Sequence, residues 1–248
     1  MDVPFPYRLA VFDMDDTLLG PEKEVSAENR LALDRLRAAH VEVVIASGRY
    51  QANIASFEEG LGFRSWIISS GGDVVSHAAT GEIIHENTVP QDLALDLFHR
   101  VREAGISLIG YHRSGIFCDA QIKWTALDLH RTGRVPIADI PALIDTGLQK
   151  LIWITASERI AELTPRLLEE YRGRLYIVST EREMLEFFNS EVNKALAVQV
   201  LAQLLNIPRE HILAFGDGNN DVSLLEWADM SVAMAHGRET ARRAAKKD

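Results

Sequence analysis

Short apolar runs alternate with helical segments along the chain, and this alternation limits the possible folds more than any other property of the sequence. Apolar runs at 9–12, 41–46 and 66–69 are separated by segments at 27–39 and 51–59 whose apolar residues recur at helical spacing. Such alternation is typical of a parallel sheet covered by helices on both faces. We therefore predict βαβ units in the first third of the chain.

The pattern changes after about residue 82 and returns near residue 189. Strands are predicted at 83–89, 106–111, 116–119, 151–155, 175–179 and 184–188, helices at 92–104 and 158–171, and an irregular proline-marked region at 136–141. This βαββ order, repeated, indicates an α+β insert. A helix at 194–205 and a strand at 212–215 then resume the first pattern. The prediction is an α/β protein with a Rossmann-like doubly wound core, 1–82 and 189–248, and an inserted domain, 83–188.

Charge and composition narrow the possible partners. The 248 residues carry a formal net charge of -10, so nucleic acid is not expected as a partner, and an anionic ligand must be attracted locally. No apolar run approaches the ~18 residues of a membrane span. The single cysteine, Cys118, predicts a cytoplasmic protein without disulfides. We expect a monomer or weak homodimer.

Two carboxylates follow directly on the first predicted strand. Asp13 and Asp15 stand at positions i and i+2, so in an extended chain both side chains address the same side. One carboxylate can attack phosphorus while the other donates and later accepts a proton. Both steps concentrate negative charge, which a magnesium ion would neutralise. Such an acidic cluster could equally be a helix cap or a turn. The residues at the ends of the other strands are needed to choose between these interpretations.

The second strand ends in Ser47-Gly48-Arg49. Ligands bind at the carboxyl ends of the strands in an open parallel sheet. The hydroxyl group and free backbone amides of this segment could hold a phosphoryl oxygen. A serine at this place would serve equally well as the N-cap of the following helix.

Polar groups also follow the insert and the later strand. Asp217, Asn220 and Asp221 offer oxygen ligands suited to the same cation, although turns alone favour such residues. A dinucleotide-binding glycine motif is rejected, because Asp221 replaces its third glycine and carboxylates repel a pyrophosphate. Lys194 opens the helix after the insert, where its charge could pair with a phosphate or with Asp13.

The four motifs together resemble those of the haloacid dehalogenase superfamily of phosphohydrolases. They occur in the order Asp13-Met14-Asp15-Asp16-Thr17, Ser47-Gly48-Arg49, Lys194 and Gly216-Asp217-Gly218-Asn219-Asn220-Asp221. The insert resembles the type IIB cap of the Cof-like branch, whose members are phosphatases of sugar phosphates and related metabolites. The resemblance covers almost the whole chain.

The resemblance implies a role for each motif residue. Asp13 would be the nucleophile, and Asp15 the general acid/base that also offers a backbone carbonyl to Mg²⁺. Thr17 would support the motif. The implied phosphate-binding residues are Thr17, Ser47, Gly48, Arg49, Lys194 and Asn220, and the implied metal ligands are Asp13, Asp15, Asp217 and Asp221.

Three features depart from the family pattern. Ser70-Gly71-Gly72 replaces the usual Asn-Gly pair, and Ala233-Met234-Ala235-His236-Gly237 lacks a usual asparagine. Family members also usually continue beyond the position of Asp248 through another strand and a helix. The cap is expected to choose the substrate, with Tyr111, His112 and Trp124 as possible contributors, although core packing or an ordinary surface position is the preferred explanation for each of them.

The expected function is magnesium-dependent hydrolysis of a small phosphorylated metabolite through an aspartyl-phosphate. A phosphomutase with the same core would keep the aspartyl-phosphate but return the phosphoryl group to the sugar. A phosphometabolite-binding protein without turnover is the third possibility. Binding alone, however, has no need for a nucleophile paired with an acid such as Asp13 and Asp15.

Overall fold

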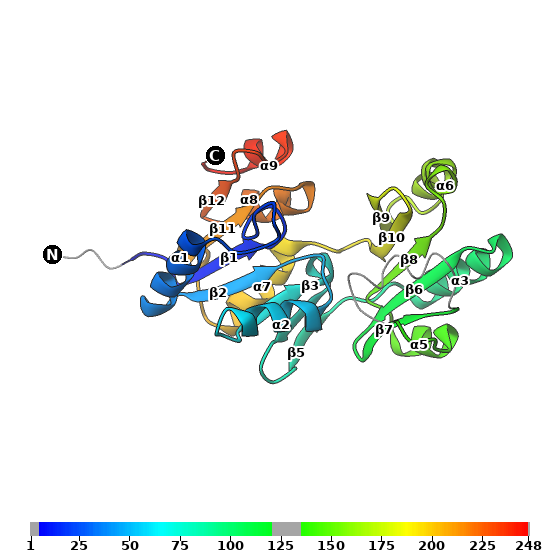
Figure 1. Ribbon diagram of the computed structural model, residues 1–248, viewed down its shortest axis with the longest axis horizontal. Helices are drawn as coiled ribbons and strands as arrows, with labels where there is room; N and C mark the ends of the chain where they lie inside the picture. Colours follow the sequence, from blue (N-terminus) through cyan, green and yellow to red (C-terminus); the bar gives the residue numbers. More distant parts are fainter. Residues whose placement is uncertain (1–4, 121–134, 248) are drawn as a thin grey trace. The chain divides into compact units, whose positions relative to one another are not determined.

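The computed structural model describes residues 5–120 and 135–247 and divides into two compact units. The first unit combines both ends of the chain, up to Glu86 and from Asn193, and the second unit is the segment Asn87–Val192. Figure 1 follows the chain through both units. The first unit is therefore discontinuous in sequence, because the second is inserted into it.

A seven-stranded sheet forms the centre of the first unit. Its strands, in spatial order, are β12 (Met230–Ala233), β11 (Ile212–Gly216), β1 (Leu9–Asp13), β2 (Glu42–Ala46), β3 (Trp66–Ser69), β4 (Val74–His77) and β5 (Ile83–Glu86). The strands from β12 to β3 are parallel, whereas β4 and β5 are antiparallel to their neighbours. The predicted α/β class with a parallel-sheet core is confirmed, and the antiparallel edge is additional.

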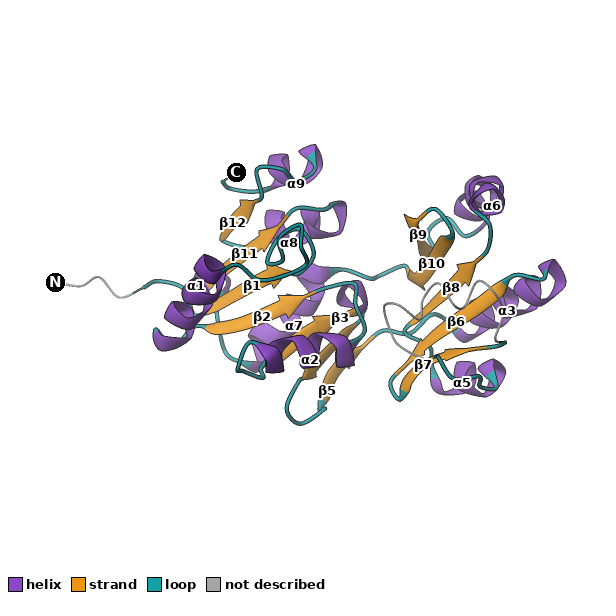
Figure 2. Cartoon of the chain, viewed as in Figure 1, coloured by secondary structure: helices purple, strands orange, loops and turns teal. Residues whose placement is uncertain are grey.

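Helices cover both faces of this sheet (Figure 2). Helices α1 (Ala27–Ala38) and α2 (Gln51–Gly60) pack with the strand residues Ala10 and Phe12 on one face. The opposite face holds Leu9 and Val11 under α7 (Lys194–Leu204) and α8 (Val222–Trp227). A last helix, α9 (Glu239–Ala244), packs near α8. The alternate residues of the buried strand β1 thus build two cores, which explains its uniformly apolar sequence.

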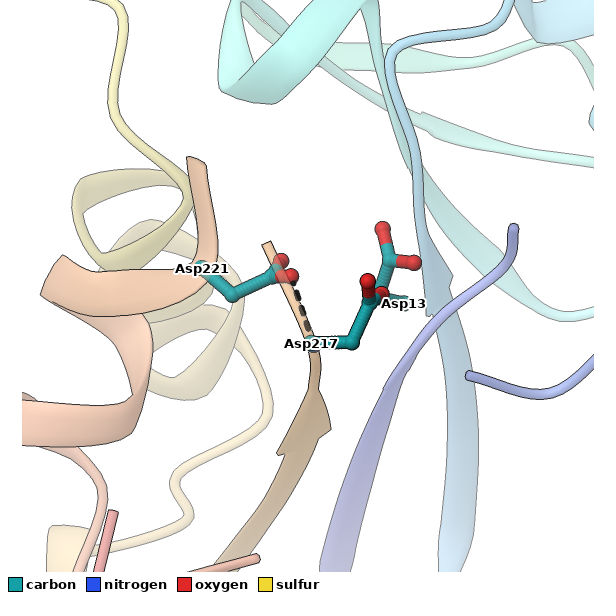
Figure 3. Close-up of side chains that lie close together, drawn as sticks. All are labelled: Asp13, Asp217 and Asp221. Carbon is teal, nitrogen blue, oxygen red and sulfur yellow. Dashed lines mark hydrogen bonds between the residues drawn. The ribbon is translucent and has the colours of Figure 1, made fainter. Parts of the chain in front are cut away.

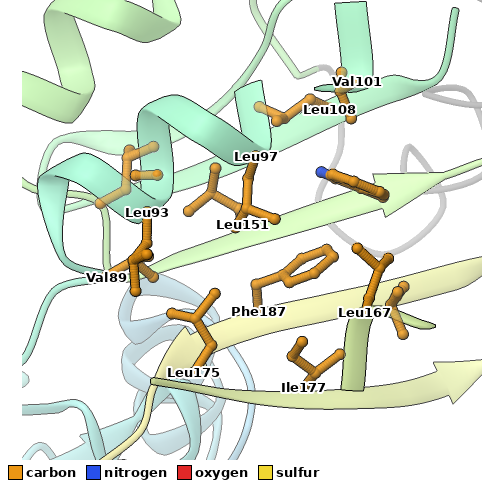
Figure 4. Packing of buried hydrophobic residues seen from close by; sticks show 14 of the residues in the cluster. Val89, Leu93, Leu97, Val101, Leu108, Leu151, Leu167, Leu175, Ile177 and Phe187 are labelled. Carbon is orange, nitrogen blue, oxygen red and sulfur yellow. The ribbon is translucent and has the colours of Figure 1, made fainter. Parts of the chain in front are cut away.

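The second unit is a five-stranded antiparallel sheet with helices packed on one face. The strand order is β7 (Gly115–Cys118), β6 (Ser107–His112), β8 (Lys150–Ile154), β10 (Met184–Asn189) and β9 (Leu175–Glu181). Its helices within the described residues are α3 (Gln91–Ala104), α5 (Ile140–Thr146) and α6 (Ser157–Glu170). Alternate strand residues such as Leu108, Leu151 and Phe187 point towards these helices and form the core in Figure 4.

Two expectations about the insert are wrong in detail. The run at 83–89 does not open the insert, because its ordered part, β5, pairs with β4 in the first unit's sheet. The unit boundaries accordingly fall after Glu86 and after Val192, rather than after residues 82 and 188. Part of the region expected to be irregular begins helix α5, where Pro141 occupies the first turn, whose backbone N–H groups have no partner within the helix.

Candidate active site

The strand ends bring the predicted motifs to one edge of the seven-stranded sheet. Asp13 is the last residue of β1, and its register partner on β2 is Ala46, which directly precedes Ser47. On the other side of β1, β11 ends at Gly216, directly before Asp217. Because these strands are parallel, their carboxyl ends meet, and segments as far as 200 residues apart in sequence, such as those of Thr17 and Asp217, share one site.

A buried lysine joins two of the carboxylates. The side-chain amide oxygen of Asn193 accepts hydrogen bonds from the first backbone N–H groups of α7, so the helix begins at Lys194. Lys194 Nζ donates to Asp13 Oδ1 at 2.5 Å and to Asp221 Oδ1 at 2.6 Å, and the lysine is fully buried. Burial opposes the charge of Lys194, but the two carboxylates raise its pKa overall.

Asp221 is fixed through both carboxylate oxygens. While Oδ1 binds Lys194, Oδ2 accepts hydrogen bonds from the backbone N–H of Asp217 at 3.0 Å and of Gly218 at 2.8 Å. The approach is so close that a Cβ atom at Gly216 would lie 2.6 Å from the Asp221 carboxylate carbon. The glycine before the motif aspartate is therefore a packing requirement, which turn preferences alone do not reveal.

Three carboxylates gather within reach of one cation (Figure 3). Asp13, Asp217 and Asp221 each offer an oxygen within 4.8 Å of the others. Burial raises the pKa of Asp13 to about 7 against the opposing charge of Lys194, and the neighbouring carboxylates add to the rise. Burial also raises the pKa of Asp217. One lysine does not balance three acids, so this donor set suits a hard divalent cation such as Mg²⁺.

The carboxylate oxygens differ in their availability to such an ion. Asp13 Oδ1 binds Lys194, and Asp217 Oδ1 accepts a hydrogen bond from Thr17 Oγ1 at 2.9 Å. Among the described residues, nothing donates to the remaining Oδ2 atom of either Asp13 or Asp217. Both oxygens of Asp221 are engaged. The hydrogen bonds thus leave Asp13 and Asp217 with open ligand positions.

Asp15 turns towards two cations. Its carboxylate receives two hydrogen bonds from Arg49, at 2.7 and 3.0 Å, and Lys23 Nζ lies 3.5 Å away. Burial raises the pKa of Asp15, but the hydrogen bonds and charges of Arg49 and Lys23 lower it overall. Lys23 was not among the sequence candidates. A lysine in the loop that follows two motif aspartates is the signal that could have identified it.

Ser47 also lies at this edge, and its position excludes one alternative. Its hydroxyl accepts a hydrogen bond from the backbone N–H of Arg49 at 3.2 Å, and the residue is buried. The N-cap position of α2 belongs to Tyr50, so Ser47 does not cap that helix. Gly48 lies beside it, and a Cβ atom added at Gly48 would meet no other atom within 4 Å. Asn220 is exposed on the turn before Asp221.

The segment around His236 is hydrogen-bonded to the loops that follow β1 and β11. His236 Nε2 donates to the backbone carbonyl of Asp16 at 2.7 Å, and the N–H of Arg238 donates to the carbonyl of Asp217 at 2.8 Å. The histidine that departs from the family pattern therefore links the loops after β1 and β12. A side chain at Gly237 would collide with the backbone carbonyl of Asp217 at 3.0 Å.

Two of the insert candidates for substrate selection, Tyr111 and His112, pack within their own unit. Tyr111 and His112 are both buried, and Lys150 Nζ lies 4.3 Å from the centre of the Tyr111 ring. The His112 ring hydrogen-bonds Ser114 and Thr146. Trp124 lies outside the described residues.

The fold, a parallel α/β sheet with acidic motifs at its carboxyl edge and an α+β insert, defines a haloacid dehalogenase-type enzyme. The family model for haloacid dehalogenase-like hydrolases matches residues 10–247, so the chain belongs to this family. Its type IIB, Cof-like insert is confirmed as well. No helix among residues 5–120 and 135–247 is long and apolar enough to cross a membrane.

Individual relatives match along most of their length. The chain is 28% identical to the phosphatase YwpJ of Bacillus subtilis, covering 94% of this chain and 90% of the relative. It is 26% identical to the HMP-PP phosphatase of Cronobacter sakazakii, covering 92% and 84%. A haloacid dehalogenase-like hydrolase from Bacteroides thetaiotaomicron has a similar crystal structure, with a TM-score of 0.86, 26% identity and coverage of 97% and 93%.

Proposed function

We propose that this hydrolase is a magnesium-dependent phosphatase of small phosphorylated metabolites that works through an aspartyl-phosphate on Asp13. The observation that carries the proposal is the buried lysine between Asp13 and Asp221, at 2.5 and 2.6 Å. Lys194 orients Asp13 and, together with Arg49 and Lys23, supplies local positive charge in a protein of net charge -10. The relatives named as phosphatases support the same reaction.

In the first step, a carboxylate oxygen of Asp13 attacks phosphorus. An oxygen–phosphorus bond to Asp13 forms as the bond from phosphorus to the leaving oxygen breaks. Asp15 donates a proton to that oxygen, so the product leaves as an alcohol. Lys194 holds Asp13 in position and stabilises charge on the phosphoryl oxygens.

In the second step, the oxygen of a water molecule attacks phosphorus while Asp15 takes a proton from that water. The bond between Asp13 and phosphorus breaks, inorganic phosphate leaves, and the Asp13 carboxylate is regenerated. Ser47 lies at the same sheet edge, with Gly48 beside it, and its hydroxyl group would donate to a phosphoryl oxygen through these steps.

The open carboxylate oxygens of Asp13 and Asp217 are the proposed side-chain ligands of Mg²⁺, with the backbone carbonyl of Asp15. When bound, the ion would neutralise and orient the phosphoryl oxygens. Asp221, whose oxygens already bind Lys194 and the turn, would act by positioning Lys194 and Asp217. Thr17 would hold Asp217 through its hydroxyl group.

Arg49 has two roles in this proposal. Without substrate it binds the Asp15 carboxylate through two hydrogen bonds, which favours the charged form of Asp15. A guanidinium group also binds phosphate with paired hydrogen bonds. We infer that Arg49 turns to the substrate phosphoryl group and frees Asp15 to carry a proton.

The test is release of inorganic phosphate from a panel of phosphorylated metabolites, with and without Mg²⁺. The native protein should release phosphate from at least one monoester only when Mg²⁺ is present. Asp13→Asn should lose at least 10³-fold in kcat, because the amide is a poor nucleophile. Glu59→Gln, an exposed change on α2, serves as the control with native activity.

Three outcomes would reject parts of the proposal. Native activity in Asp13→Asn would exclude the covalent mechanism. Activity that survives exhaustive chelation would exclude the metal. Transfer of the phosphoryl group to another position of a sugar, without phosphate release, would identify a mutase instead.

A further inference from the structure

A hollow lies on the face of the seven-stranded sheet that carries α1. Its volume is about 530 Å³, and its lining comes wholly from the first unit. The lining is largely apolar and includes Phe12, Leu33, Leu36, Leu213, Phe215 and Met234. Small-molecule sites have volumes of about 300 to 1,000 Å³ and apolar walls with a few polar groups. This hollow has both properties.

On this face α1 packs against β2 and α2 against β3, and the hollow lies beside α1, where Leu213 and Phe215 of β11 form part of its wall. Phe12 of β1 and Phe215 of β11 project on this face, where their rings stack at 4.6 Å with an interplanar angle of 3°. Helix α1 packs over β1 and β2 through Leu33. Parallel sheets are normally covered on both faces. Among residues 5–120 and 135–247, the apolar surface beside α1, towards β11, is accessible in this hollow.

The polar groups in the wall are of two kinds. Thr17 donates to Asp217, and the Asn29 side-chain N–H donates to the carbonyl of Leu18 at 3.1 Å, so both donors are engaged. Arg35 on α1 also lines the hollow. Among the described residues, no carboxylate forms an ion pair with Arg35. The wall therefore combines an apolar surface with one unpaired positive charge.

We propose that this hollow binds a small hydrophobic anion, with its apolar body against Phe215 and Leu213 and its acidic group at Arg35. The site is distinct from the phosphoryl site, since it lies on one face of the sheet rather than at its carboxyl edge. The two sites share Thr17, which lines the hollow and hydrogen-bonds Asp217. A ligand in the hollow can thus affect the catalytic carboxylate Asp217 through its contact with Thr17.

The probe is 1-anilinonaphthalene-8-sulfonate, an aromatic body with one negative charge, titrated against the native full chain by fluorescence. Its neutral analogue N-phenyl-1-naphthylamine tests the role of charge. We expect saturable binding of one molecule per chain. Ala32→Trp, which fills the hollow from the exposed side of α1, should weaken binding of both probes at least tenfold.

A matched variant and a charge variant complete the test. Ala38→Trp places the same side chain on the same helix outside the lining and should bind both probes as the native chain does. Arg35→Gln should weaken the anionic probe about three- to fivefold, the effect of one exposed charge, and leave the neutral probe unchanged.

Circular dichroism of each variant checks that the fold is retained. Binding that does not saturate, or that is equal in Ala32→Trp and Ala38→Trp, would overturn the proposed site. Equal loss of both probes in Arg35→Gln would overturn the preference for an anion.

Discussion

Replacing Glu58 by glutamine should stabilise the protein at pH 8 and change its stability little at pH 5. Glu58 lies on α2 and has no exposed surface. Its Oε2 accepts a hydrogen bond from the Ser65 backbone N–H at 2.9 Å, and its Oε1 lies 3.0 Å from the Ser65 hydroxyl. That hydroxyl donates to the carbonyl of Val43 at 2.6 Å. A protonated Glu58 can therefore donate to the Ser65 oxygen, and a glutamine amide can do the same.

Burial raises the pKa of Glu58 from 4.5 to about 7, and the hydrogen bonds of Ser65 oppose only part of this rise. A raised carboxyl pKa means that its contribution to stability is complete below pH 4.5 and is lost as the pH rises to about 7. At about 1.4 kcal/mol per pH unit, the loss is about 3 kcal/mol at pH 8 and under about 1 kcal/mol at pH 5. Glutamine does not ionise and avoids this loss.

The measurement is urea unfolding of the native chain and Glu58→Gln at both pH values, with amide hydrogen exchange to follow the first unit separately. The difference in free energy of unfolding should grow by about 2 kcal/mol between pH 5 and pH 8. Glu59→Gln, an exposed neighbour paired with Arg64, should show no such growth. A pH-independent difference for Glu58→Gln would refute the reasoning.

Three further substitutions test the site and its supports. Gly216→Ala places Cβ 2.6 Å from the Asp221 carboxylate and should lower kcat by about 10²-fold; native phosphatase kinetics would contradict this. Thr17→Val removes the hydrogen bond to Asp217 and should lower kcat/KM about tenfold. Thr17→Ser keeps the hydroxyl group and should have a kcat/KM close to the native value. Gly72→Ala, at φ 119° and 2.6 Å from backbone, should lower the free energy of unfolding by about 3 kcal/mol. Gly81→Ala, at φ 71° in open space, should cost about 1 kcal/mol, and equal losses would argue against the close approach at Gly72.

The regular elements of the core follow from local sequence. The predicted strand at 41–46 corresponds to β2, Glu42–Ala46, and the predicted helix from Lys194 begins at that residue. These elements have strong apolar periodicity and clear caps, which depend on neighbours in sequence. The run at 83–89 was assigned to the wrong domain. An extended apolar run does not specify which sheet it joins, and pairing with β4 settled that choice.

The roles expected at the site depended on local sequence to different degrees. The acidic group of Asp13 and the basic group of Lys194 can be read from the sequence, because an ionisable group is a property of the residue type. Their separation of 2.5 Å is not, because it depends on the register of parallel strands and on the start of α7. The hydrogen bonds of Asp221 to Lys194 and the turn, and the pairing of Asp15 with Arg49, likewise join residues distant in sequence.

The class of fold, the insertion of one unit into another and the set of reactive side chains follow from the residue pattern alone. These depend on composition and on periodicities of two and 3.6 residues, which are local. Tertiary structure alone decided which carboxylate oxygens remain open, why Gly216 has no room for a side chain, and that an apolar hollow lies beside α1. Such properties come from packing between segments that only the folded chain brings together.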